Sequence, residues 1–257
     1  MLFAADIGNS CVSFGVFDAT GRLVMQSKVD AVKTKSADEY AILFREILSL
    51  YRIEVAEITD AILSSVVPPL TCAIRLAIGR LFGVSPMEVG AGIKTGLNIK
   101  IDMQTQLGAD LVANAVAALA MHTSPLVVLD LGTATTLTVI DKQGALNGVI
   151  IAPGVQVSFN ALAEYGSELP DISVAPPRRL IGKNTQDSVR SGVIYGHAAM
   201  VDGLIARIRE ELGADELTVI ASGGLASEIL PYCREKAVLS PDLTLHGLYH
   251  IREKNRK

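Results

Sequence analysis

The sequence predicts an α/β fold made of two similar domains, each with a mixed β-sheet flanked by helices. Two observations lead to this prediction. Short apolar runs typical of strands alternate with longer segments that carry helix start and stop signals. In addition, the pattern around Asp6 and Gly8 returns around Asp130 and Gly132, 124 residues later, which is close to half of the 257-residue chain.

Composition agrees with a folded protein and argues against several function classes. Hydrophobic residues make up 49% of the chain, charged residues 19%, and the net charge is −4. Disorder needs low hydrophobicity and high net charge, and nucleic-acid binding favours a basic domain or stripe. No apolar run reaches the ~18 residues of a membrane span, and the start lacks the basic segment of a signal peptide. We therefore expect no nucleic-acid partner, no membrane partner and a cytoplasmic location, in which Cys11, Cys72 and Cys233 stay free thiols.

The first half begins with an apolar run that ends in a glycine turn, as a buried strand does. The turn Asp18–Gly21 then predicts a hairpin between two further strands. A capping box at Ser36–Glu39 predicts a helix start, and Pro68-Pro69 suit the first turn of another helix that ends at Gly83. The expected strands are Phe3–Ile7, Cys11–Phe17, Leu23–Val29 and Ala61–Val67, and the expected helices run from Ser36 to about Tyr51, from Pro68 to Gly83 and over Leu107–His122.

The second half repeats this opening. Each copy has, in order, a strand-end Asp, a Gly, a turn Asp and a turn Gly. The spacings between them are 2, 10 and 3 residues in the first copy and 2, 9 and 3 in the second. Two common hairpins could agree by coincidence, but the match at both the strand end and the turn favours a duplication. The expected strands are Leu126–Leu131, Thr135–Ile140, Ala145–Ile151 and Leu217–Ala221, and helices are expected at Val155–Ala163, from Thr185 to about Leu212 and from Leu243. No linker of low complexity separates the copies, so we expect domains at 1–123 and 124–257.

The two Asp-x-Gly turns are candidate phosphate-binding sites. Glycine allows a phosphate to approach the backbone N–H groups closely, and the carboxylates lie at strand ends, the usual ligand edge of an α/β sheet. Asp6 could hold Mg²⁺ directly or through water, while Asn9, Ser10 and Thr133 could donate hydrogen bonds to phosphate oxygens. One such turn alone fits a tight hairpin better; a matched pair favours a phosphate clamp.

Two further candidates carry weaker signals. Asp110 is expected in the first turn of an apolar helix, where the helix dipole favours the ionised form. An ordinary aspartate, with a reference pKa of ~3.9, is an anion at pH 7 in any case. It could accept a proton from an attacking hydroxyl, although its position also fits an ordinary first-turn aspartate. Gly223-Gly224, after a predicted strand, could approach a nucleotide base or ribose, or could be a simple turn.

Taken in order along the chain, these motifs resemble those of the type III pantothenate kinases, in the acetate kinase/sugar kinase/Hsp70/actin superfamily. The resemblance extends nearly end to end, and an ordered series at matching separations is far more specific than any one motif. It is carried by Asp6–Ser10, Ser64–Pro69, Gly92–Leu97, Gly108–Asp110, Asn114–Ala118, Asp130–Thr136, Ala152–Gly154, Gly182–Thr185, Ser191-Gly192, Tyr195-Gly196 and Ser222–Leu225.

The resemblance implies duplicated ribonuclease H-like, actin-like domains and phosphorylation of the 4′-hydroxyl of pantothenate by ATP, the first step of coenzyme A biosynthesis. It also implies Mg²⁺, a monovalent cation (K⁺ or NH₄⁺) and a homodimer. Asp110 would be the proton acceptor and Asp130 a ligand of the monovalent cation. The ATP-binding residues would be Asp6, Ile7, Gly8, Asn9, Ser10, Cys11, Val12, Ser13 and Thr133, and the substrate-binding residues Gly108, Ala109, Asp110, Leu111 and Thr185, the last at the dimer interface.

The chain departs from the family pattern on the substrate side. Leu111 stands where the family usually has arginine, Ile101–Gln104 where it has tyrosine followed by Asn-Pro, and Gly166–Glu168 where it has Thr-Ala-Lys. Lys94 and Lys100 are the nearest cations that could replace the arginine. Two alternatives follow: a kinase of the same fold that acts on another small alcohol, and a non-catalytic regulatory paralogue.

Overall fold

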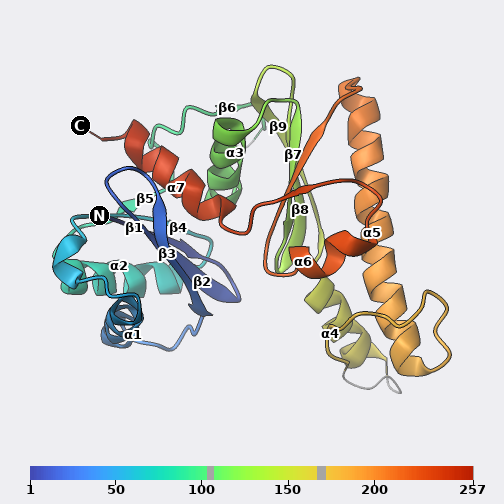
Figure 1. Ribbon diagram of the computed structural model, residues 1–257, viewed down its shortest axis with the longest axis horizontal. Helices are drawn as coiled ribbons and strands as arrows, with labels where there is room; N and C mark the ends of the chain where they lie inside the picture. Colours follow the sequence, from blue (N-terminus) through green and yellow to red (C-terminus); the bar gives the residue numbers. More distant parts are fainter. Residues whose placement is uncertain (103–106, 167–171, 257) are drawn as a thin grey trace. The chain divides into compact units, whose positions relative to one another are not determined.

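The computed structural model describes residues 1–102, 107–166 and 172–256, and these form two compact units (Figure 1). Unit 1 comprises Met1–Leu97, Asp102–Ala120 and Asp242–Lys257, and unit 2 comprises Asn98–Ile101 and Met121–Pro241. Each unit is built on one mixed sheet, as the sequence predicts. Parts of two expected departures from the family pattern, at residues 103–104 and 167–168, lie outside the described residues.

Unit 1 contains a five-stranded sheet in the order β3-β2-β1-β4-β5. The first three strands form an antiparallel meander, and β4 and β5 extend it in parallel from β1. The strands are β1 (Leu2–Ile7), β2 (Cys11–Phe17), β3 (Leu23–Asp30), β4 (Asp60–Ser65) and β5 (Met87–Glu88), and the helices are α1 (Ala37–Leu50), α2 (Pro68–Phe82), α3 (Ala109–Met121) and α7 (Leu243–Lys254), with a 3₁₀ turn, η1 (Val55–Glu57).

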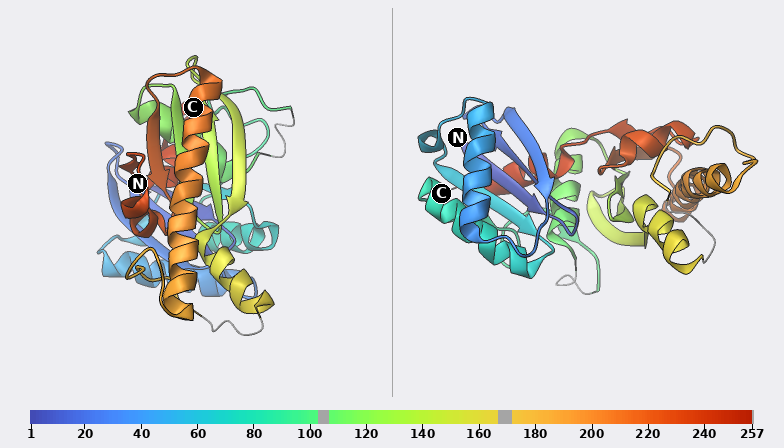
Figure 2. Two further views of the ribbon diagram at one scale, coloured as in Figure 1. Left: turned by 90° about the vertical axis from the view of Figure 1, so that its right-hand side faces the viewer. Right: turned by 90° about the horizontal axis from the view of Figure 1, so that it is seen from below.

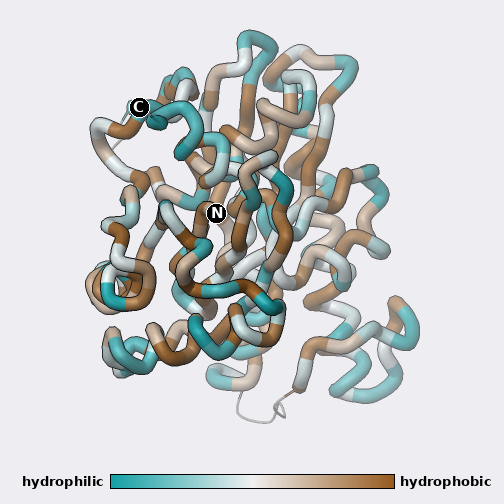
Figure 3. Tube along the Cα trace, turned by 60° about the vertical axis from the view of Figure 1, so that its left-hand side comes forward, coloured by the Kyte–Doolittle hydropathy of each residue, from teal (hydrophilic) through white to brown (hydrophobic). Residues whose placement is uncertain are grey.

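Strand alternation gives this sheet two apolar faces, each covered by a helix pair. Phe3 and Phe14 pack with α1 and α2, and the Phe14 and Phe44 ring centroids lie 4.9 Å apart. Leu2 and Ile62 point the other way and pack with α3 and α7. The α1 helix begins with the predicted Ser36–Glu39 capping box. Hydrophobic and hydrophilic stretches alternate along much of the Cα trace (Figure 3).

Unit 2 contains a six-stranded sheet in the order β11-β10-β7-β8-β9-β6. The long helix α5 runs along one face of this sheet and, with α4 and α6, encloses its apolar core (Figure 2). The strands are β6 (Asn98–Ile99), β7 (Leu126–Leu131), β8 (Ala134–Ile140), β9 (Ala145–Pro153), β10 (Thr218–Ser222) and β11 (Val238–Leu239), and the helices are α4 (Val155–Tyr165), α5 (Thr185–Leu212) and α6 (Ala226–Ile229), followed by the 3₁₀ turn η3 (Leu230–Tyr232).

The duplication is confirmed by strand order and by register. The order 3-2-1-4-5 in unit 1 recurs as β9-β8-β7-β10-β11 in unit 2. Asp6 is in register with Ser64 on the parallel neighbour β4, and Asp130 is in register with Ser222 on the parallel neighbour β10. The hairpins β2–β3 and β8–β9 also change register at equivalent positions, at Val16/Phe17 and Val139/Ile140. Coincidence between two ordinary hairpins does not produce this level of agreement.

The two units differ from the expected division at residue 123. Helix α7 belongs to unit 1, because Leu245, Leu248 and Ile251 complete the apolar layer beneath β1 and β4. The short strand β6 belongs to unit 2, where it pairs with β9 in parallel. Amphipathic patterns predict helices without identifying the sheet they cover, and this limits the boundary prediction. Within the described part of the chain, no helix combines the length and apolar character needed to cross a bilayer.

Candidate active site

The first glycine turn closes directly after β1. The Gly8 N–H donates a 2.9 Å hydrogen bond to the Cys11 carbonyl oxygen. Asn9 and Ser10, at the tip, are exposed, whereas Ile7 and Val12 are buried in the core. In the expected ATP-binding segment, the exposed tip residues Asn9 and Ser10 can therefore reach a ligand. The buried side chains of Ile7 and Val12 anchor the turn to the sheet.

Asp6 is held in place by a residue from the neighbouring strand. Ser64 Oγ donates a 2.7 Å hydrogen bond to Asp6 Oδ1, and Ser64 is fully buried. Because parallel partners in register place their side chains on the same face, this bond orients the carboxylate at the carboxyl end of β1. A fixed carboxylate next to a phosphate-binding turn is the kind of group that Mg²⁺ uses, together with water and substrate phosphates.

Val66 connects this turn with the segment that precedes α3. Its N–H donates a 3.1 Å hydrogen bond to the Ile7 carbonyl oxygen. Its Cγ1 lies 3.6 Å from the position that a Cβ would take at Gly108. The first turn and the start of α3 are thus neighbours within unit 1, as a shared site requires.

Asp110 lies in the first turn of α3, half-buried. Its Oδ1 accepts a 2.8 Å hydrogen bond from the Leu111 N–H. Burial raises the pKa of the Asp110 carboxyl, and this outweighs the lowering by the backbone hydrogen bonds. Burial therefore affects this carboxyl more than the backbone hydrogen bonds of the helix start, whereas the sequence suggested an ordinary aspartate pKa. A higher pKa makes the carboxylate a stronger proton acceptor. A side chain at Gly108 would collide with this carboxylate, so glycine there leaves it room.

A pocket of about 350 Å³ opens beside Val66 at the start of α2. Its lining includes one cation, Arg75, and one anion, Glu88. The hydroxyls of Ser65 and Thr71, 2.6 Å apart, bond to each other at its base. Val66, which adjoins Gly108, and the Arg75 side chain thus line the same pocket within unit 1.

The second glycine turn, in unit 2, is enclosed by two further glycines. The Gly132 N–H donates a 3.1 Å hydrogen bond to the Ala134 carbonyl oxygen, and Thr133 at the tip is exposed. A Cβ at Gly154, the residue before α4, would lie 2.6 Å from the Gly132 carbonyl oxygen. Gly223 has φ +96° and would place a Cβ 2.6 Å from Asp130 Oδ1. Only glycine permits these approaches, so Gly223 supports the second turn itself.

Asp130 is surrounded by oxygen-bearing side chains on its own face of the sheet. Thr136 on β8 and Ser222 on β10 are its register partners. Thr136 Oγ1 is buried and has no hydrogen-bond partner among the described residues. A carboxylate with hydroxyl groups beside it suits a hard cation that prefers oxygen ligands. Among the described residues, no three His, Cys, Asp or Glu side chains come together to hold a metal ion.

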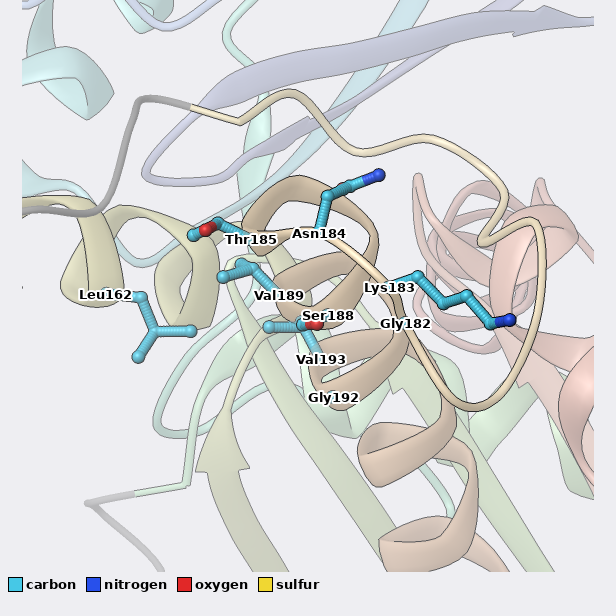
Figure 4. A pocket seen from close by; sticks show the side chains of 9 residues that line it. All are labelled: Leu162, Gly182, Lys183, Asn184, Thr185, Ser188, Val189, Gly192 and Val193. Carbon is cyan, nitrogen blue, oxygen red and sulfur yellow. The ribbon is translucent and has the colours of Figure 1, made fainter.

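Thr185 lines a pocket of about 630 Å³ between α4 and the start of α5 (Figure 4). Asn184 caps α5 by accepting a 2.8 Å hydrogen bond from the Asp187 N–H, and it donates another of 2.8 Å to the Asp187 carboxylate. Leu162 forms the opposite wall, while the Lys183 side chain extends away from it. A polar helix start facing an apolar wall suits a small amphipathic ligand.

Comparison with known proteins identifies the family. The family model described as type III pantothenate kinase matches residues 2–207. A type III pantothenate kinase from Geotalea uraniireducens is 41% identical over 257 residues, covering 100% of both chains. The chain belongs to the type III pantothenate kinase family.

Solved structures support the fold. A putative 2-dehydro-3-deoxygalactonokinase from Sinorhizobium meliloti is similar with a TM-score of 0.61 and 13% identity, covering 99% of this chain and 96% of the other. A conserved putative Baf family transcriptional activator from Campylobacter jejuni has a TM-score of 0.60 and 17% identity, covering 98% of each chain. At these identities the likeness concerns the fold alone, and it agrees with the predicted actin-like duplication.

Within this family frame, the structure places the predicted site residues in two groups. Unit 1 holds the Asp6–Ser13 segment and Gly108–Leu111, and unit 2 holds Asp130, Thr133 and Thr185. Leu111 is buried, 9% exposed, so its side chain belongs to the packing of α3. Sequence reasoning placed Ser64, Thr136 and Ser222 in family motifs but gave them no role, and it gave His197 none. The register of the duplicated strands could have indicated the two serines, because each is in register with the strand-end aspartate of its own unit.

Proposed function

We propose that this protein transfers the γ-phosphoryl group of ATP to the 4′-hydroxyl of pantothenate, the first step of coenzyme A biosynthesis. The observation that carries the proposal is the pair of Asp-x-Gly turns at equivalent strand ends, Asp6–Gly8 and Asp130–Gly132, in a chain of this family. Phosphoryl transfer depends mainly on positioning and charge stabilisation. Two matched turns with exposed polar residues at their tips would supply both.

We assign the chemistry to residues as follows. The tip residues Asn9, Ser10 and Thr133 hydrogen-bond the ATP phosphates. Asp6, oriented by Ser64, would hold Mg²⁺, which offsets phosphate charge when bound. Asp110 accepts the proton of the attacking hydroxyl, and its raised pKa suits this task. Thr185 binds the acceptor from the pocket at the start of α5.

We further propose a monovalent cation at Asp130, K⁺ or NH₄⁺. The buried Thr136 hydroxyl, which lacks a hydrogen-bond partner among the described residues, supports this assignment. It lies in register with Asp130 and on the same face of the sheet. The cation would add positive charge beside the second phosphate-binding turn.

A homodimer is also part of the proposal. The apolar helix α3 offers little surface for a dimer contact, because residues 111–118 are buried within the chain. The support comes from large exposed apolar side chains around the start of α5 and the end of α4, which are typical of an interface. They are Leu162, Tyr165, Leu180 and Ile181, the last 79% exposed. We expect the dimer in the cytoplasm, where ATP is supplied and where Cys11, Cys72 and Cys233 remain free.

A kinase for another small alcohol is the second candidate, because buried Leu111 cannot bind a carboxylate as an arginine would. ADP release in potassium buffer, with pantothenate present and absent, separates the two. The proposal expects release that depends on pantothenate, with a phosphorylated product detected by mass spectrometry. ADP release only with a different alcohol would favour the second candidate, and ATP binding without turnover on any acceptor would favour a regulatory role.

A further inference from the structure

Thr135 and His197 share a buried hydrogen bond in unit 2. Thr135 Oγ1 and His197 Nε2 are 2.6 Å apart. Thr135 is fully buried and His197 is 6% exposed. Thr135 is in β8, two residues after Thr133 at the tip of the second glycine turn, and it is in register with Leu131 at the end of β7. The bond therefore holds the strand end on which this turn rests.

His197 brings this contact to the helix that lines the Thr185 pocket. It lies one helical turn after Val193, which is part of the pocket wall, so the two share a face of α5. The same glycine turn meets α4 through the close approach of Gly154 to the Gly132 carbonyl oxygen. Helix α4 is thus fixed to the second glycine turn by the close packing of Gly154, and helix α5 by the hydrogen bond of His197.

The chemistry of the pair suits a permanent contact. Burial lowers the pKa of His197, so the imidazole is neutral at pH 7. A neutral imidazole has one donor and one acceptor nitrogen and can bond to a hydroxyl in either tautomer. Removing one partner would leave a buried polar group unsatisfied, which costs more than the bond itself contributes.

We propose that His197 is a positioning residue for phosphoryl transfer: through Thr135 it fixes the second phosphate-binding turn to the helix that carries the acceptor pocket. The inference rests on the proposed function, since it takes residues 132–134 as a phosphate-binding turn. His197 does not touch the reacting atoms. Its effect is to hold the turn in the conformation that binds ATP.

Two pairs of substitutions test the contact. Thr135→Val and His197→Phe remove the hydrogen bond while keeping most of the volume, and Thr135→Ser and His197→Gln keep a group that can make it. Thr138→Val is the matched control. Thr138 is a fully buried threonine of the same strand whose hydroxyl has no hydrogen-bond partner among the described residues.

The readouts are the dissociation constant of a non-hydrolysable ATP analogue, measured by calorimetry, and kcat and KM with ATP and pantothenate. We expect Thr135→Val and His197→Phe each to weaken analogue binding and lower kcat/KM for ATP about tenfold, as loss of one hydrogen bond does. The double variant should be no worse than the poorer single variant. Thr135→Ser and His197→Gln should recover most of the loss, and Thr138→Val should match the wild type.

Two results would overturn the inference. One is that the effects of Thr135→Val and His197→Phe add up in the double variant. The other is that both single variants keep analogue affinity and kcat/KM within twofold of the wild type. If Thr135→Val or His197→Phe does not fold, Thr135→Ser and His197→Gln are compared with Thr138→Val instead. The inference requires near wild-type analogue affinity in Thr135→Ser and His197→Gln, and a clear loss in these two variants would contradict it. Wild-type protein that binds the analogue without phosphorylating pantothenate would contradict the proposed function alone, because the affinity measurements still test the contact.

Discussion

Ser64 Oγ donates a 2.7 Å hydrogen bond to Asp6 Oδ1 from the adjacent parallel strand, and this bond fixes the carboxylate beside the first glycine turn. Ser64→Ala should lower kcat/KM for ATP about ten- to hundredfold, because a hydrogen bond to a charged group contributes roughly 1.5–3 kcal/mol. The loss should be reduced as Mg²⁺ is raised. Ser64→Thr, which keeps the hydroxyl, is the control. If Ser64→Ala leaves the Mg²⁺ dependence of the enzyme unchanged, Ser64 does not orient Asp6 for Mg²⁺.

Asp110→Asn should bind ATP and lose at least about a hundredfold in turnover, the lower range for a general base. The wild-type pH profile provides a second measurement. The base acts when deprotonated, and its pKa is raised by burial, so activity should fall on acidification at a pH above the ordinary aspartate range. Near wild-type turnover in Asp110→Asn would exclude Asp110 as the proton acceptor.

The same pKa shift predicts the effect of Asp110 on stability. The folded state binds this proton more readily than the unfolded state, so stability falls as pH rises from the unfolded pKa through the raised folded pKa. At neutral pH the buried carboxylate is therefore destabilising. Asp110→Asn should unfold at the same or a higher temperature than the wild type at pH 7, measured by calorimetry. A clear drop in melting temperature would contradict the assigned direction.

Activity should depend on K⁺ or NH₄⁺, with Na⁺ a poor substitute. A cation series at constant ionic strength measures this, and Thr136→Val should raise the K⁺ concentration needed for half-maximal activity because it removes a hydroxyl beside Asp130. Thr138→Val serves as the control on the same strand. Equal rates in sodium, potassium and choline would refute the cation site.

Light scattering should give a dimer of the 27.2 kDa chain. Ile181→Asp places a charge on one of the most exposed apolar side chains and should shift the protein to monomer, with loss of pantothenate turnover. Leu50→Asp is a matched control, since Leu50 is 80% exposed on α1 in unit 1. A fully active wild-type monomer would count against the homodimer and against Thr185 at its interface.

The acceptor carboxylate needs a cation other than the missing arginine. Lys100, one of the two lysines suggested by the sequence, donates a 2.7 Å hydrogen bond to Asp141 within unit 2, which engages its charge in the hairpin turn. Lys94 remains a candidate, and the structure adds Arg75, which lines the pocket beside Val66.

If a cation of unit 1 compensates, Leu111→Arg should change KM for pantothenate little. Arg75→Ala or Lys94→Ala should then raise it about ten- to hundredfold, the effect of a lost charged hydrogen bond. Steady-state kinetics with pantothenate as the varied substrate decide this, with Lys100→Ala as the control. A tenfold or larger fall of KM in Leu111→Arg would show that compensation is absent and would favour another natural acceptor.

Local signals predicted much of this molecule. The capping box at Ser36 begins α1, Gly83 ends α2 with φ +70°, and the repeated Asp-x-Gly turns led to the duplicated sheets and to the family. The roles of the individual site residues are predictions that the substitutions above test.

Contacts between distant parts of the chain were beyond local signals. Ser64 reaches Asp6 over 58 residues, and His197 reaches Thr135 over 62. A buried serine or histidine resembles an ordinary core residue until strand register, for Ser64, or the packing of a helix on the sheet, for His197, brings a partner opposite it. The raised pKa of Asp110 was missed for the same reason, since burial depends on the whole fold.

The membership of α7 in unit 1 has a consequence for biosynthesis. Residues 242–257 are synthesised after the whole of unit 2, yet they complete the layer over Leu2 and Ile62 in unit 1. The sheet of unit 2 can therefore be fully assembled while the N-terminal sheet still has one apolar face incompletely covered. A nascent chain or a C-terminally truncated product presents that face to solvent, and such faces favour aggregation and chaperone binding. Loss of residues 242–257 should therefore destabilise the sheet of unit 1 first, although strands β1–β5 precede unit 2 in the order of synthesis.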